Sequence, residues 1–174
     1  MKQLINTILK TASLFLLIAV IFVTGCQQPK QDPSQELKPV VDKFVEIWNN
    51  GNLDELDAIF DPGFVRIVNQ TPIVKGVDGL KKVMSGFRTA FPDLKLTIDN
   101  EVYTENSAVA RWTFSATNTG PGDIPPTGKS VEIWGLDMLQ FVNGKISKQM
   151  VAYDEKSLLE QLGFTMMPMA SEKK

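Results

Sequence analysis

Residues 129–163 have the sequence "KSVEIWGLDMLQFVNGKISKQMVAYDEKSLLEQLG", and this stretch decides the fold. Apolar and polar residues alternate over most of its length, which is the period of a β-strand. The pair Asn143-Gly144 interrupts the alternation, and Asn-Gly supplies the positive φ that a tight hairpin turn needs. After Asp154 the period becomes helical, and Gly163 is a typical helix end. The stretch predicts a β-hairpin followed by a short C-terminal helix.

Two more strands are predicted upstream, at 95–105 and 107–118. Before them, amphipathic helices are predicted at 37–51, 53–60 and 76–91, and one short strand is predicted at 64–68. Helices followed by an antiparallel meander indicate an α+β domain. Because the long strands are apolar on more than one side, we expect the helices to cover the sheet. A strongly curved sheet wrapped around a helix would enclose a hollow suited to a ligand.

The N-terminus has the pattern of an export signal. Lys2 and Lys10 precede the apolar run "LFLLIAVIFV", which is short for a membrane span. The run ends in "VTGC", which resembles the lipobox of bacterial lipoproteins, where the cysteine becomes the first mature residue and carries the lipid. The resemblance implies a signal peptide at 1–25, a lipid on Cys26, and a membrane-anchored protein on the extracytoplasmic side, periplasmic or cell-surface. A transmembrane anchor with an incidental cysteine is the alternative.

Three segments follow the signal peptide. Residues 26–36 are polar and contain two prolines, so we expect a tether after the lipidated cysteine. Residues 37–165 suit one compact domain with a single core. Residues 166–174 form a tail, and three of its first four residues are methionine.

The composition excludes several kinds of site. The chain has no histidine, which rules out serine–histidine and cysteine–histidine catalysis and removes the commonest zinc ligand. The carboxylates show no calcium-loop spacing, so we expect neither metal nor cofactor. Removing residues 1–25 removes two lysines and no acid, which leaves 16 basic against 20 acidic residues and argues against a nucleic-acid partner. Cys26 is the only cysteine, so an intrachain disulfide is excluded.

Strand parity brings three polar residues onto faces that otherwise look buried. Asp154 falls on the face of Met150, and Asp137 alternates with apolar residues on its own strand. Asn118 shares a face with Trp112. An acid in apolar surroundings has a raised pKa and suits proton transfer. An amide beside it suits a developing enolate.

Each of these residues also has a structural interpretation. Asp154 immediately precedes a helix, where an aspartate caps the backbone N–H groups and has a lowered pKa. Asp137 would be a hydrogen-bonded buried acid, and Asn118 a turn residue. The large apolar side chains that we expect to line a pocket, or else to belong to the core, are Trp48, Phe91, Trp112, Trp134 and Met150.

Four motifs give the chain a family resemblance: "FPDL" at 91–94, "PPTGK" at 125–129, "NGKI" at 143–146 and "DEKSLLEQLG" at 154–163. Together they resemble the SnoaL-like polyketide cyclases, or ester cyclases, of the nuclear transport factor 2-like superfamily. The resemblance implies a cone-shaped α+β barrel, in which a curved, mainly antiparallel sheet wraps around N-terminal helices. It also implies a cofactor-free aldol-type ring closure, with Asp154 as the general acid/base.

The chain departs from the family pattern at several positions. A frequent His-Thr-Gly is Asn118-Thr119-Gly120 here, and a frequent Glu and Trp after "GKI" are Lys148 and Met150. Two functions therefore stay open. One is an acid–base enzyme acting on a small apolar carbonyl compound, with Asp137 and Asn118 supporting Asp154. The other is a non-catalytic lipoprotein that binds a small apolar ligand or a protein partner; a homodimer is open in both.

Overall fold

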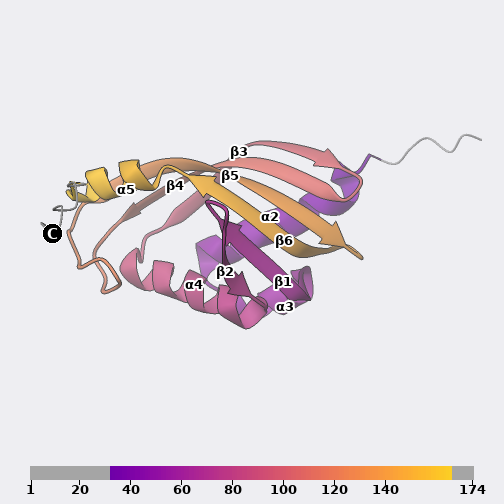
Figure 1. The fold of residues 1–174 in the computed structure, drawn as a ribbon, viewed down its shortest axis with the longest axis horizontal. Coiled ribbons are helices and arrows are strands. Elements are labelled where there is room, and N and C mark those ends of the chain that lie inside the picture. Colours follow the sequence, from indigo (N-terminus) through magenta and orange to yellow (C-terminus); the bar gives the residue numbers. More distant parts are fainter. Residues whose placement is uncertain (1–31, 166–174) are drawn as a thin grey trace, which may run out of the picture. The chain divides into compact units, whose positions relative to one another are not determined.

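The computed structural model describes residues 32–165 (Figure 1). The expected signal peptide, Cys26, most of the tether and the whole of the tail at 166–174 lie outside the described residues. The elements in chain order are α2 (Ser34–Asn50), the 3-10 helix η1 (Leu53–Glu55), α3 (Leu56–Ile59), β1 (Phe60–Val68), β2 (Thr71–Lys75), α4 (Val77–Ala90), β3 (Lys95–Thr104), β4 (Ser107–Thr117), β5 (Ser130–Val142), β6 (Lys145–Tyr153) and α5 (Glu155–Leu162). The α+β class, the N-terminal helices and the short C-terminal helix are confirmed.

The six strands form one sheet in the order β2-β1-β6-β5-β4-β3. Four of the neighbouring pairs are antiparallel, and β1 pairs with β6 in parallel. The sheet is thus mainly antiparallel, as expected, but β2 and β3 remain as its two edges, so the expected barrel is not closed. Helices α2 and α4 lie on the same side of the sheet (Figure 1).

Helix α2 presents one apolar stripe to the sheet. Its buried residues are Leu37, Val41, Phe44, Ile47 and Trp48. The helix ends at Gly51, which has a φ of 80°. Arg88 of α4 binds this end, since its Nη1 donates to the carbonyl oxygen of Trp48 at 2.7 Å and to that of Asn49 at 3.1 Å. The cation satisfies C-terminal carbonyls and ties the last turn of α2, with Trp48, to α4.

Strand β5 alternates without interruption. Every odd-numbered residue from Val131 to Phe141 is buried and every even-numbered one from Ser130 to Val142 is exposed. At Gly135, a Cβ atom would lie 2.2 Å from the ring of Trp112, its cross-strand partner on β4. A glycine at this position therefore lets the indole of Trp112 lie directly over β5.

Strand β6 contains a bulge that changes which residues face inward. Gln140 pairs with Lys148, whereas Phe141 pairs with Ile146, so Ser147 is an extra residue in β6. Ile146 is buried before the bulge, and the buried positions after it are Gln149 and Val151. The parity count that placed Asp154 on an inner face with Met150 is therefore wrong.

Candidate functional site

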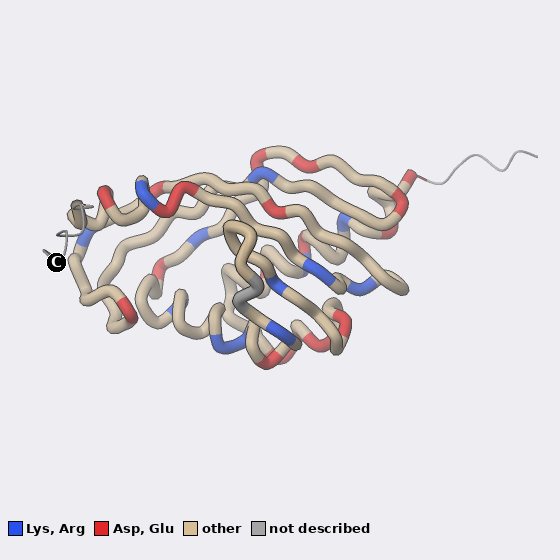
Figure 2. Tube along the Cα trace, viewed as in Figure 1, with Lys and Arg blue, Asp and Glu red and all other residues tan. Residues whose placement is uncertain are grey.

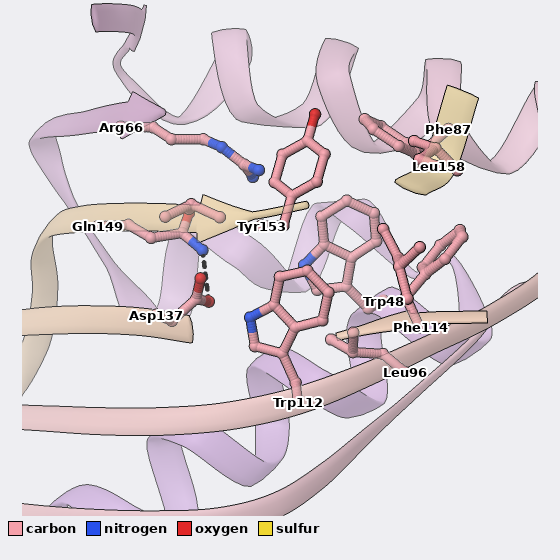
Figure 3. A pocket seen from close by; sticks show the side chains of 12 residues that line it. Trp48, Arg66, Phe87, Leu96, Trp112, Phe114, Asp137, Gln149, Tyr153 and Leu158 are labelled. Carbon is pink, nitrogen blue, oxygen red and sulfur yellow. Dashed lines mark hydrogen bonds between the residues drawn. The ribbon is translucent and has the colours of Figure 1, made fainter. Parts of the chain in front are cut away.

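A cavity lies on the covered side of the sheet, where α2 and α4 approach the inner faces of β4, β5 and β6 (Figure 3). Its volume is about 60 Å³, which holds roughly four water molecules. Most of its wall is apolar, and the main contributors are Trp48, Phe87, Leu96, Trp112, Phe114 and Ile133. The wall is thus rich in aromatic rings, and the polar side chains gather at one part of it.

The polar part comes from three adjacent strands. Arg66 of β1 and Gln149 of β6 are partners in the parallel pairing, and Asp137 of β5 lies one strand further along. Gln149 Nε2 donates to Asp137 Oδ2 at 2.7 Å. Tyr153, further along β6, lies between this group and the aromatic wall (Figure 3). The sheet order therefore brings together residues that are far apart in the sequence.

Arg66 and Asp137 differ from the other charged residues of the described part of the chain. Acidic and basic residues are interspersed along the trace (Figure 2), and several form surface pairs, such as Lys38 with Glu101 at 2.6 Å. Of all charged residues at 32–165, only Arg66 and Asp137 are buried, each with 8% of its surface exposed. The guanidinium of Arg66 makes no hydrogen bond or ion pair with any described residue.

Three buried polar atoms at this end of the cavity lack a hydrogen-bond partner among the described residues: Arg66 Nη1, Asp137 Oδ1 and Gln149 Oε1. Buried polar atoms in native proteins are nearly always satisfied, because an unsatisfied one costs about 1–3 kcal/mol. Three such atoms lining one cavity can be satisfied only by groups that enter it, either water or the polar atoms of a ligand.

Burial sets the charge states of this group. Burial raises the pKa of the Asp137 carboxyl, while the nearby positive charge of Arg66, the hydrogen bond from Gln149 and the neighbouring Trp112 indole oppose the rise. The indole nitrogen of Trp112 points toward this carboxyl (Figure 3). Burial lowers the pKa of Arg66, but a guanidinium remains protonated at physiological pH. Burial also raises the pKa of Tyr153. Asp137 is thus an acid that can exchange a proton inside an apolar cavity.

The family model for SnoaL-like polyketide cyclases matches residues 38–162. The chain belongs to the SnoaL-like polyketide cyclase family. Similar solved structures include AclR from Streptomyces galilaeus, a candidate hydroxylase, with 27% identity, a TM-score of 0.68, and coverage of 78% of this chain and 90% of that one. TsrD from Streptomyces laurentii has 25% identity, a TM-score of 0.67, and coverage of 74% and 96%.

The fold is also shared by more distant members. A candidate SnoaL-like polyketide cyclase from Jannaschia sp. CCS1 is 15% identical with a TM-score of 0.71, and the match covers 80% of this chain and 99% of that one. No protein with curated annotation matches the sequence. The named relatives include both a candidate hydroxylase and a candidate cyclase. Membership of the SnoaL-like family therefore identifies the fold, and the reaction has to be inferred from the residues of the site.

Asp154 holds the position that the SnoaL-like resemblance marks as catalytic, and here it caps α5. Its Oδ1 accepts a hydrogen bond from the backbone N–H of Ser157 at 2.8 Å, and the residue is exposed. It does not line the cavity. The structure therefore supports the capping interpretation, and the expectation that Asp154 faces the hollow is wrong because the bulge at Ser147 moves it off the inner face.

Asn118 and Phe91 are buried but stand outside the cavity. Asn118 Nδ2 donates to the carbonyl oxygen of Ala90 at 3.2 Å, and its Oδ1 accepts from the backbone N–H of Thr127 at 2.9 Å. The amide thus closes the loop between β4 and β5 onto the end of α4. Phe91 packs behind the wall, with ring centroids 6.4 Å from Phe87 and 5.7 Å from Phe114. Asn118 is a structural residue, and Phe91 belongs to the core.

Two other expected pocket residues lie on the opposite face of the sheet. Trp134 is 51% exposed and its ring lies 5.3 Å from the guanidinium carbon of Arg111. Met150 is half-buried and lines a groove on that outer face together with Leu136 and Met138. Both were wrongly expected in the pocket, whereas Trp48, Trp112 and Asp137 line the cavity.

Arg66, Gln149 and Tyr153 also line the cavity and were not predicted from the sequence. Arg66 has a signal in the sequence, because it alternates with Phe64 and Val68, which are both buried. A basic residue on the apolar face of a strand indicates a buried charge. Gln149 and Tyr153 have no such signal, since the bulge in β6 hides their face.

Neither a metal cluster nor a membrane-spanning helix is found in the described part of the chain. Between residues 32 and 165, no three His, Cys, Asp or Glu side chains lie close enough together to hold a metal ion. In the same range, no helix has the length and apolarity needed to cross a bilayer.

Proposed function

We propose that the protein is a membrane-anchored lipoprotein whose SnoaL-like domain binds a small carbonyl compound in the cavity beside Arg66, Asp137 and Gln149. The observation that carries the proposal is the set of three unpaired polar atoms at one end of an otherwise apolar cavity. The apolar wall binds the body of the ligand, and the polar atoms bind and orient its oxygen atoms.

The aromatic side chains favour a small planar ligand, and because the cavity of about 60 Å³ is smaller than the roughly 150 Å³ that accommodates a benzene ring, the wall must open to admit one. Trp48 and Trp112 both present rings to the cavity, and aromatic rings pack well on flat apolar surfaces. A second groove shares Phe87, Tyr153 and Leu158 with the cavity and is bounded by Ile124 of the β4–β5 loop. These three shared side chains separate the cavity from the groove. Their rotation joins the two spaces, which admits the ligand and gives it more room.

Anchoring rests on the sequence of the N-terminus. The run "VTGC" places Cys26 directly after a short apolar segment, as in the lipobox of bacterial lipoproteins. The polar residues that follow separate the domain from the lipid-bearing cysteine in the sequence. The domain thus binds its ligand close to a membrane surface, on the extracytoplasmic side.

A second candidate function is acid–base catalysis by Asp137, favoured by the raised pKa of this buried carboxyl. In this reaction the Asp137 carboxylate removes a proton from the carbon next to the ligand carbonyl. The electron pair moves onto the carbonyl oxygen, where the Arg66 guanidinium stabilises the enolate. Return of the proton from Asp137 to another carbon completes the cycle without a cofactor; in the alternative, the enolate attacks a second carbonyl and Asp137 gives its proton to the resulting alkoxide.

Calorimetric titration with two probes, acetophenone and benzoate, tests the binding function. Ile133 lines the cavity, so we expect Ile133→Phe to fill it and abolish binding of whichever probe the wild-type domain binds. Leu136→Phe is the matched control, because it lies on the same strand with its side chain on the outer face, 41% exposed. Binding that survives Ile133→Phe unchanged, or absence of binding by both probes, contradicts the proposed site.

A further inference from the structure

The two buried charges at the end of the cavity are not in contact with each other. Asp137 is hydrogen-bonded by Gln149, and Arg66 has no ion-pair or hydrogen-bond partner at residues 32–165. Arg66 nonetheless acts on Asp137 through its charge. A buried cation is stabilised far more by a carboxylate in direct, bidentate contact than by one at a distance. The Arg66 guanidinium therefore lacks an anion on the side that faces the cavity.

A ligand carboxylate would satisfy both Arg66 Nη1 and Asp137 Oδ1, provided that Asp137 is protonated. The guanidinium donates to one ligand oxygen, and the protonated Oδ1 of Asp137 donates to the other. The second negative charge itself favours this protonation, because two carboxylates at hydrogen-bond distance cannot both remain ionised in an apolar site. The cavity is electrically neutral before binding, with Arg66 and Asp137 charged, and neutral after it.

We infer that the polar end of the cavity binds the carboxylate of a small aromatic acid, with Arg66 as its cation, and that Asp137 takes up one proton when the acid binds. This inference rests on the proposed function, since it names the ligand class of the same cavity. A neutral ketone satisfies Arg66 only: it offers no donor to Asp137 Oδ1 and no charge to the guanidinium.

The groups around Asp137 make it the residue that exchanges this proton. From β1 it faces Arg66, which is permanently charged. From β4 and β6 it faces Trp112 and Gln149, which do not titrate in this range. Tyr153 is the other titratable side chain in the cavity wall, and burial together with the charge of Glu155 raises its pKa further from neutrality.

Calorimetry with benzoate and acetophenone, in buffers of different ionisation enthalpy, tests the inference. We expect benzoate to bind at least about 30-fold more tightly than acetophenone, because losing one partner of a buried charge pair costs at least that much. The proton uptake measured from the buffer dependence should approach one in the pH interval above the pKa of Asp137 in the free protein and below its higher pKa in the complex. In that interval the benzoate affinity should fall about tenfold per pH unit.

Three variants separate the roles of the two charges. Asp137→Asn resembles the protonated acid, so it should bind benzoate with no proton uptake and with a flat pH dependence. Arg66→Gln should lose benzoate affinity by about 30-fold or more. Arg111→Gln is the control for the loss of an arginine, since Arg111 lies on β4 with its side chain 44% exposed, and it should bind like wild type. Circular dichroism checks that each variant is folded.

Several results would overturn the inference. Equal or tighter binding of acetophenone, zero proton uptake across the interval, or proton uptake that persists in Asp137→Asn would each contradict it while leaving a ligand in the cavity. The proposed function fails separately, if neither probe binds or if Ile133→Phe binds them as the wild type does.

Discussion

The amide of Gln149 donates to the carboxyl of Asp137 across strands β6 and β5, over 2.7 Å. This bond uses Oδ2, and Oδ1 has no hydrogen-bond partner among the described residues; the same holds for Nη1 of Arg66, which lines the same cavity. Asp137 is therefore fixed in orientation while its second oxygen remains available to a ligand. The acid of this site is thus Asp137, in the middle of β5, and not Asp154, which precedes α5.

The first prediction concerns the pH dependence of folding. Burial raises the pKa of Asp137 in the folded protein, whereas the unfolded chain has a value of about 3.9. As the pH rises above that value, the unfolded state loses its proton first, so the free energy of unfolding falls until the raised pKa is passed. The loss is about 1.4 kcal/mol for each pH unit of the shift.

Asp137→Asn removes this contribution, because asparagine does not titrate. The free energy of unfolding of wild type minus that of Asp137→Asn, measured by urea denaturation at several pH values, isolates Asp137 from the other acids. We expect this difference to decrease as the pH rises, because only the wild type is destabilised by the loss of the Asp137 proton. A difference that is constant with pH, or that favours the wild type at high pH, contradicts a raised pKa.

The second prediction separates the cap from the site acid. Asp154→Ala removes the hydrogen bond to the Ser157 N–H and should lower the free energy of unfolding by about 1 kcal/mol. Asp154→Asn keeps a capping oxygen and should be nearly neutral. Both variants should bind benzoate as the wild type does, because Asp154 does not line the cavity. Loss of ligand binding in a folded Asp154→Asn protein would restore the role implied by the family motif.

The third prediction concerns Gly135, which makes room for Trp112. Gly135→Ala places a Cβ atom 2.2 Å from the indole ring, so the ring must move into the cavity. We expect a loss of roughly 1–3 kcal/mol in the free energy of unfolding, together with weaker benzoate binding. The matched control is Gly86→Ala in α4, where an added Cβ meets no atom within 4 Å. It should stabilise the protein by up to about 1 kcal/mol.

The fourth prediction concerns the membrane anchor. Cys26→Ser removes the thiol to which the lipid is attached in the lipoprotein proposal. Expressed with its full N-terminus, the wild type should fractionate with membranes, and the mature protein should have the mass of a chain beginning at a lipidated Cys26. The Cys26→Ser variant should lack that mass. An unmodified Cys26 in a membrane-bound wild type would indicate a transmembrane anchor.

The hairpin and the inner face of β5 were predictable from the sequence because both depend on local patterns. Asn143 and Gly144 have φ values of 51° and 73°, as a turn of this kind requires. The unbroken alternation of β5 places Asp137 on the buried face. The same alternation places Trp134, three residues earlier, on the exposed face, so its assignment to the pocket was avoidable.

The rest of the site depends on long-range pairing that local periodicity does not contain. The parallel pairing of β1 with β6 brings Arg66 beside Gln149, across more than half of the domain sequence. The bulge at Ser147 reverses the parity of β6, which misplaced Asp154 and Met150 and concealed Gln149. Bulges are set by the neighbouring strand, so a count along one strand does not reveal them.

Asp137 is proposed to be the proton-exchanging acid of the ligand site. The most direct test is a carbon-13 NMR titration of its side-chain carboxyl, assigned by comparison with Asp137→Asn, in the free protein and with saturating benzoate. We expect a pKa above the usual value of about 3.9 in the free protein and a further rise in this pKa when benzoate binds. A carboxyl that titrates in the ordinary range, or whose pKa is unchanged by bound benzoate, would contradict it.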